Sequence, residues 1–299
     1  MTAEKKTLQQ KWKESSRAKI YIGLAQPLLA EFFTMILHTF WGSMVVATNI
    51  PIHYSALNRT IQPQEWAADY LVSTFMPAFQ AGFAVWMFIV LFWNICVINF
   101  NPAISVGLAV AGVLSPWLLL PYIIMQCLGS ILGAVIAQAI KNDEPGPFLI
   151  PDDANISAIL CCEVMITGCM VFFTVTMVVD KTYNQATGPL AIGLTVFQGI
   201  IAGKWIGAGC LNPSRAFGPA VVLGGRAWNY HWVWWVGDCA GAFIFAVIYM
   251  CFFAPKDKVW IVKVMDWMKP DEVVEDDIEE HEILFNNELN FNPINSQLI

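Results

Sequence analysis

The chain has 299 residues, of which 57% are hydrophobic and only 13% are charged, and its formal net charge is -7. This composition is rare among soluble domains and typical of a protein that lies largely in a lipid bilayer. The sequence contains no Cys/His grouping with zinc spacing, no phosphate-binding glycine loop and no nucleophile elbow. We therefore expect no enzymatic activity, no metal, no cofactor and no nucleic-acid partner.

Six apolar stretches follow a hydrophilic segment at residues 1–21. About 20 apolar residues are needed to cross the hydrocarbon core as a helix. The stretches that meet this requirement lie at about 23–48, 73–95, 116–139, 156–179, 187–203 and 231–253. Two further apolar segments, 101–111 and 212–222, are too short to cross, and each begins with Asn-Pro. Because Asn caps helices and Pro suits the first helical turn, we expect two half-helices that begin inside the membrane.

The two halves of the chain repeat the same order of segments. Glu31 in the first span precedes the Asn-Pro at 101, and Glu163 in the fourth span precedes the Asn-Pro at 212. Each half has three spans, an odd number, so the second half must be inverted relative to the first. The sequence predicts an all-α membrane protein of six transmembrane helices plus two half-helices in an inverted 3+3 repeat, with the channel domain at 22–253.

Basic residues near the ends of the spans predict the orientation. Lysines and arginines cluster before the first span and after the sixth, which predicts that both termini are cytosolic, in the plasma membrane or an internal membrane. The two Asn-x-Ser/Thr sequons, at Asn58 and Asn155, fall on the opposite side and are candidate glycosylation sites. Residues 254–299 form an acidic cytosolic tail, which is either simply solvated or a docking site for a cytosolic partner.

Two Asn-Pro boxes, Asn101-Pro102-Ala103 and Asn212-Pro213-Ser214, occupy equivalent places in the repeat, and Arg215 follows the second box directly. Gly188-Pro189-Leu190 opens the fifth span. On these motifs, residues 22–253 resemble the aquaporin (major intrinsic protein) family. Details such as Asn94, Ile200 and Cys210 look most like the aquaporin-8 type. The resemblance implies a homotetrameric, passive channel for water and small neutral solutes.

The boxes suggest how such a pore excludes protons and ions. Each half-helix brings about half a positive charge to its N-terminus, so two such ends at the midplane repel cations. Asn101 and Asn212 then offer amide donors to a passing oxygen, and a water that accepts from both does not relay a proton along the file. The alternative is that these side chains only cap their helices.

Spacing relative to the boxes assigns the selectivity filter by the same resemblance. It predicts a ring of Ala81, Ile200, Gly209 and Arg215, in which the position of Ala81 holds Phe in water-specific members and His in the aquaporin-8 type. Small or apolar side chains at three positions predict a wider filter, with hydrogen peroxide, ammonia or urea as candidate permeants besides water. A nearby large residue, Phe83 or Trp86, could refill the gap. Arg215 alternatively forms a structural pair with a carboxylate.

Several residues retain two interpretations. Glu31 and Glu163 either accept hydrogen bonds from the loops that carry the boxes, as the resemblance implies, or relay protons. Cys210 is either a thiol-reactive group in the outer vestibule or a buried small hydrophobe. Bulky Val97 and Ile98 before the first box could narrow the pore. Two other classes of protein stay open: a membrane-junction or scaffold protein with a closed pore, and a secondary transporter that uses the two glutamates as coupling carboxylates.

Overall fold

The computed structural model describes residues 21–45, 71–180, 187–261 and 263, and the regular elements in these residues are all helical. The long helices are α3 (Gln26–Val45), α5 (Met76–Phe92), α7 (Pro116–Lys141), α8 (Ile156–Val179), α9 (Gly188–Lys204) and α11 (Trp232–Phe252). The short helices are α6 (Pro102–Val110) and α10 (Pro213–Leu223). Single π-helical turns, η1 (Tyr21–Ala25) and η3 (Leu71–Phe75), lead into α3 and α5, and a 3-10 turn, η4 (Gly225–Trp228), follows α10.

The predicted fold class is confirmed. Five of the described helical stretches are long and apolar enough to cross a membrane, and α9 is apolar but shorter, at 17 residues. The half-helices begin at Pro102 and Pro213, as the Asn-Pro boxes predict. The second span ends earlier than expected, at Phe92, and Trp93–Ile95 form a turn that leads into the loop before the first box.

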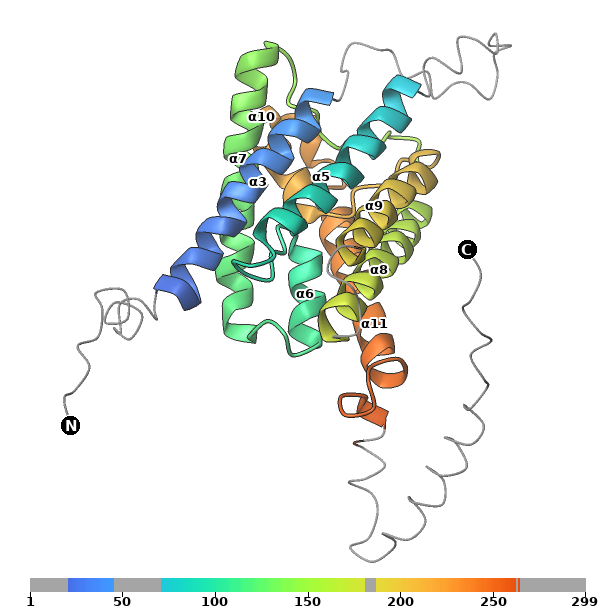
Figure 1. The fold of residues 1–299 in the computed structure, drawn as a ribbon. Helices are drawn as coiled ribbons and strands as arrows, with labels where there is room; N and C mark the ends of the chain where they lie inside the picture. The colour runs from blue at the N-terminus through green and yellow to red at the C-terminus, as the bar shows by residue number, and fades with distance from the viewer. Residues whose placement is uncertain (1–20, 46–70, 181–186, 262, 264–299) are drawn as a thin grey trace, which may run out of the picture.

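The helix contacts repeat between the two halves. Helix α3 packs against α7, and α8 packs against α11 in the same way. Half-helix α6 packs against α11, and α10 packs against α7, so each half-helix is held mainly by a helix of the other half. Figure 1 shows α10 and α6 at opposite ends of the bundle, and the first residues of α3 and the last of α11 at the same end. This is the arrangement that an inverted repeat requires.

Two glycines mark the pseudo-two-fold axis where α5 meets α9. A Cβ atom at Gly82 would lie 2.5 Å from the carbonyl oxygen of Gly193, and a Cβ at Gly193 would clash with the carbonyl oxygen of Gly82. The contact is reciprocal, so the two halves meet here with the same residue type on both sides. Close helix approach at small residues is common in membrane proteins, because dispersion packing replaces the hydrophobic effect.

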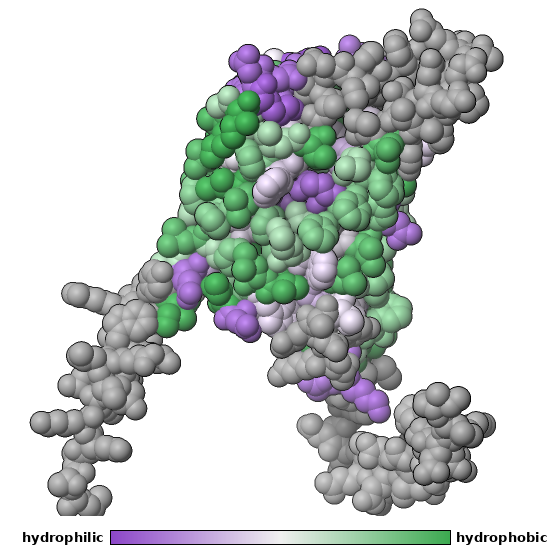
Figure 2. Space-filling model, turned by 45° about the horizontal axis from the view of Figure 1, so that its top comes forward, coloured by the Kyte–Doolittle hydropathy of each residue, from purple (hydrophilic) through white to green (hydrophobic). Residues whose placement is uncertain are grey.

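The protein is apolar on its outside and carries polar groups inside. Figure 2 shows a largely hydrophobic belt between polar ends. Large exposed side chains such as Trp117 (88% exposed), Leu91 and Phe243 contribute to the apolar outside. The buried polar residues include Glu31, Gln126, Ser130, Glu163, Thr167 and Asp238. Apolar groups outside and hydrogen-bonded polar groups inside are the arrangement expected of a protein surrounded by lipid.

Some predictions fall on residues that the structure does not describe. The hydrophilic segment 1–20, the sequon at Asn58 and the acidic part of the tail lie outside the described residues. Asn155 is described: it is exposed, and its side-chain oxygen accepts a hydrogen bond from the Ala158 N–H (3.1 Å), so it caps α8.

Candidate functional site: two Asn-Pro boxes and an outer cavity

Each box begins a half-helix through a side-chain cap. The Asn101 side-chain oxygen accepts from the Ala103 N–H (2.9 Å), and the Asn212 side-chain oxygen accepts from the Arg215 N–H (3.3 Å). Both asparagines have extended backbone angles, as N-cap residues do. The first N–H groups of α6 and α10 therefore point toward the centre of the bundle, where the helix dipoles place partial positive charge.

The amide groups of the same asparagines join the two loops. Asn101 Nδ2 donates to the Leu211 carbonyl oxygen (2.7 Å), and Asn212 Nδ2 donates to the Phe100 carbonyl oxygen (2.9 Å). Phe100 and Leu211, one residue before each box, both adopt left-handed backbone angles (φ 36° and 54°), which are uncommon for such residues. An amide has two N–H donors. Each asparagine thus uses one donor across the axis, and both side chains also line the outer cavity described below.

Ser214 does not present its hydroxyl to the cavity. The side chain is fully buried, and its Oγ donates to the Asn212 side-chain oxygen (2.8 Å) and lies 3.7 Å from Met35 Sδ. The serine at this box therefore reinforces the cap of α10. It bonds to the side-chain oxygen of its own box.

Glu31 and Glu163 are both fully buried behind the loops. The Glu31 carboxylate accepts from the backbone N–H groups of Asn99 and Phe100 (2.7 Å each) and from Gln126 Nε2 (2.7 Å). The Glu163 carboxylate accepts from the backbone N–H groups of three successive residues, Gly209 (2.6 Å), Cys210 (2.9 Å) and Leu211 (3.2 Å). These donors would otherwise be unpaired at membrane depth.

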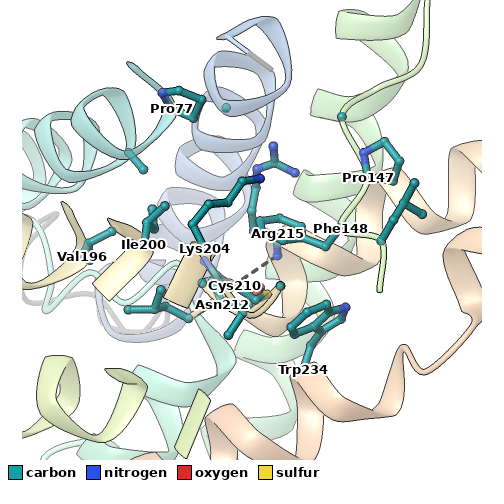
Figure 3. A pocket seen from close by; sticks show the side chains of 18 of the residues that line it. Pro77, Pro147, Phe148, Val196, Ile200, Lys204, Cys210, Asn212, Arg215 and Trp234 are labelled. Carbon is teal, nitrogen blue, oxygen red and sulfur yellow. Dashed lines mark hydrogen bonds between the residues drawn. The ribbon is translucent and has the colours of Figure 1, made fainter. Parts of the chain in front are cut away.

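A cavity of about 670 Å³ extends from the outer rim of the bundle to the two boxes. All four residues of the predicted filter line it: Ala81, Ile200, Gly209 and Arg215. Figure 3 shows Val196 and Ile200 on one side and Phe148 and Trp234 on the other, with Arg215 between them. Gly209 has φ +111°, and a Cβ there would lie 3.3 Å from Ile200, so the position favours glycine.

Arg215 fits into a space that α3 leaves open. Its side chain is only 6% exposed, and a Cβ at Gly42 would lie 2.7 Å from Arg215 Nε. The guanidinium lies over the Phe148 ring, with 5.3 Å from Cζ to the ring centroid, a cation–π contact. Its Nη1 is buried with no hydrogen-bond partner among the described residues. The structure therefore gives no support to a structural ion pair in the described part of the chain.

The residues suggested to refill the filter do not line the cavity. Phe83 is 48% exposed on the outer surface, and Trp86 packs against Gly193. Phe148, from the loop after α7, is the aromatic residue beside Arg215, and it packs edge-on against Trp234 (centroids 5.9 Å apart). No pattern in the sequence marked this loop residue.

Two further lining residues were missed although the sequence held a signal for them. Lys204 lies four residues after Ile200, so the two residues lie on the same face of α9. In Figure 3 the Lys204 side chain extends toward Arg215. His38 lies seven residues after Glu31 on α3, which again gives the same face.

A second cavity of about 450 Å³ opens on the other side of the boxes. Its lining includes Cys96, Val97, Ile98, Met177 and Ile192. Ile98 is buried and Val97 is 47% exposed. The apolar loop before the first box thus forms part of the wall of this second cavity.

Cys210 is 5% exposed and lines the outer cavity, and its Sγ donates to the Asn212 carbonyl oxygen (3.3 Å). Its position agrees with burial and also brings it to the cavity wall, while the reactivity of the thiol stays a prediction. Among the described residues, no group of three or more His, Cys, Asp or Glu side chains could hold a metal ion.

The fold and the site together define a multi-pass membrane channel with two half-helices that meet at a central lumen. The family model "Major intrinsic protein" matches residues 19–249, and the chain belongs to this family, the aquaporins. Its members are channels for water and small solutes and not enzymes. The predicted family is thereby confirmed.

Individual relatives agree with this assignment. The chain is 30% identical to aquaporin-8 of Notomys alexis over 236 residues, which covers 76% of this chain and 82% of the relative. It is 29% identical to aquaporin-8 of Rattus norvegicus over 248 residues, with 78% and 86% covered. Among solved structures, the aquaglyceroporin from Plasmodium falciparum matches with a TM-score of 0.59 and 20% identity, over 81% of this chain and 99% of that one. This last likeness concerns the fold.

Proposed function

We propose that this aquaporin is a passive channel for water and for small neutral solutes that hydrogen-bond less strongly or are somewhat larger than water, with hydrogen peroxide, ammonia and urea as candidates. The observation that carries the proposal is the filter wall. Ala81 and Ile200 line the cavity beside Arg215, so neither position contributes an aromatic or imidazole ring. Phe148 restores part of the bulk on the opposite wall. The proposed filter is thus apolar on two sides and cationic on a third.

The exclusion of protons and cations follows from the ends of the half-helices. The positive ends of α6 and α10 meet at Asn101 and Asn212, and Arg215 adds a full charge on the outer side. A cation entering from outside meets all three. A neutral solute meets fixed donors instead.

A secondary transporter is the weaker candidate. It needs a carboxylate that faces the lumen and changes its charge. Glu31 and Glu163 are fully buried, occupied by backbone donors and absent from the lining of the outer cavity. A scaffold protein with a closed pore is opposed by cavities on both sides of the boxes, about 670 Å³ and 450 Å³.

Stopped-flow measurements on proteoliposomes test the proposal. Purified protein should accelerate the flux of water and of at least one of hydrogen peroxide, ammonia or urea, and an imposed proton or sodium gradient should leave the flux unchanged. Protein-free liposomes are the control. A flux that follows the ion gradient would identify a transporter, and no flux of any solute would identify a scaffold.

Further parts of the proposal concern assembly and placement. We propose a homotetramer with both termini cytosolic, in the plasma membrane or an internal membrane, and glycosylation at Asn58 or Asn155 on the opposite side. Exposure of Asn155 supports its accessibility. The acidic tail is proposed to remain solvated unless a cytosolic partner docks on it.

A further inference from the structure

The lining of the outer cavity contains a histidine that the filter assignment does not include. His38 lies on α3, is 7% exposed and lines the cavity together with Arg215 and the two box asparagines. Its Nδ1 is buried and has no hydrogen-bond partner among the described residues. A buried ring nitrogen without a partner is costly, so Nδ1 gives no structural reason for a histidine at this position.

The position of His38 along the pore follows from its neighbours on α3. Met35 lies at the level of the second box, since its Sδ is 3.7 Å from Ser214 Oγ. Gly42 lies at the level of the Arg215 guanidinium, which touches it. With a rise of 1.5 Å per residue, His38 is about 4.5 Å beyond Met35 and about 6 Å before Gly42. It therefore lies between the boxes and the arginine.

Packing fixes the ring in this place. The imidazole meets the Phe88 ring edge-on (centroids 6.4 Å apart, planes at 77°) and the Phe100 ring at a tilt (5.5 Å, 59°). Phe100 is the residue whose carbonyl accepts from Asn212. The ring of His38 is thus coupled by one contact to the loop of the first box.

The internal repeat gives an independent reason to regard this position as pore-facing. His38 follows Glu31 by seven residues, and Met170 follows Glu163 by seven. Both line the cavity. The equivalent position in the second half therefore has a flexible apolar side chain, while the first half has a hydrogen-bonding ring. Val85 and Val196 line the same cavity with further apolar surface.

We propose that His38 is a hydrogen-bonding station for permeating solutes and a specificity-determining residue of this channel. A neutral imidazole has one donor and one acceptor nitrogen. Hydrogen peroxide donates more strongly than water and ammonia accepts more strongly, so the ring favours both over water, whereas the amide and guanidinium donors above and below serve acceptors only. Ala81 and Ile200 contribute no ring to the filter. His38 contributes one from α3, nearer to the boxes. This inference rests on the proposed channel function.

The test separates the polarity of the ring from its size. His38→Phe keeps a planar ring and removes both nitrogens, and His38→Asn keeps a donor and an acceptor in a smaller side chain. The matched control is His231→Asn, since His231 is also buried among aromatic rings but does not line the cavity. Water, ammonia and hydrogen peroxide permeabilities are measured in proteoliposomes at equal protein content, with thermal unfolding in detergent to verify folding.

One lost neutral hydrogen bond corresponds to a change of about threefold to tenfold. We expect His38→Phe to lower the hydrogen peroxide-to-water and ammonia-to-water permeability ratios by that factor, while His38→Asn and the His231→Asn control stay within about twofold of wild type. Wild-type ratios in His38→Phe together with altered ratios in His38→Asn would mean that the side chain only occupies space, and this would overturn the inference. A wild-type protein that conducts nothing would overturn the proposed function, and the inference with it.

Discussion

Replacement of Glu163 separates a structural carboxylate from a proton-relaying one. In Glu163→Ala, the backbone N–H groups of Gly209, Cys210 and Leu211 all lose their acceptor. An unsatisfied buried donor costs about 1–3 kcal/mol, which gives about 3–9 kcal/mol for the three. Since whole proteins are stable by about 5–15 kcal/mol, we expect Glu163→Ala to yield little folded protein.

Glu163→Gln is the more informative variant. Oε1 accepts from Gly209 and Cys210, and Oε2 accepts from Leu211. A glutamine with its carbonyl oxygen at the Oε1 position keeps two of the three bonds, so the expected loss is about 1–3 kcal/mol. The variant should fold, unfold at a lower temperature than wild type and still conduct water.

Thermal unfolding in detergent, followed by tryptophan fluorescence, and water flux in proteoliposomes measure the two quantities. The control is Glu144→Gln at the rim, where the carboxylate pairs with exposed Arg226 and surface pairs contribute about 0–1 kcal/mol. A Glu163→Gln protein as stable as wild type would refute the structural role, and a flux that follows a proton gradient in wild type but not in this variant would favour proton relay.

Two further predictions concern the outer cavity. Ala81→Phe adds a ring to the apolar side of the filter and should lower urea and hydrogen peroxide flux more than water flux, and Ala81→His should have an intermediate effect. Stopped-flow permeabilities measure the selectivity. Unchanged selectivity in both variants would refute the filter assignment. Cys210 lines the cavity but is 5% exposed, so mercurials should inhibit water flux slowly in wild type and not in Cys210→Ser. Equal inhibition of both proteins would show that another cysteine is the reactive one.

The sequence predicted those features that depend on membrane depth. Apolar length and the two Asn-Pro boxes specified the spans, the half-helices and the inverted repeat, because irregular backbone inside a bilayer has few solutions. Glu31 and Glu163 stood out for the same reason, since a carboxylate in a span requires a partner or an aqueous path.

The residues that line the cavity were harder to predict, for a physical reason. A helix such as α5 is apolar on the side facing lipid and largely apolar on the side facing its neighbours, so no polar periodicity marks the face that lines the pore. Phe83 was accordingly considered for the filter and lies on the outer surface. Phe148 belongs to a loop, where no periodicity exists. His38 could have been found from its seven-residue distance to Glu31.

Asp238 distinguishes the support of the second box from that of the first. Gly129 on α7 lies against the Phe32 carbonyl, and Gly241 on α11 lies against the Val164 carbonyl. Phe32 and Val164 each directly follow a glutamate that supports a box, so the two glycines are equivalent in the repeat. The motif Gln126-Cys127-Leu128-Gly129 on α7 therefore corresponds to Asp238-Cys239-Ala240-Gly241 on α11. Gln126 donates to Glu31.

In the second half, the Asp238 carboxyl group stands beside Glu163 in place of that amide and accepts from Thr167 Oγ1 (3.1 Å). Its buried Oδ2 has no hydrogen-bond partner within the described part of the chain. Because an amide supplies the donor that an ionised carboxylate lacks, we expect Asp238→Asn to unfold no earlier than wild type. Asp238→Ala leaves Thr167 without its acceptor and should unfold earlier, by about 1–3 kcal/mol of stability. An Asp238→Asn protein less stable than Asp238→Ala, measured by thermal unfolding in detergent, would show that the negative charge itself holds the second loop.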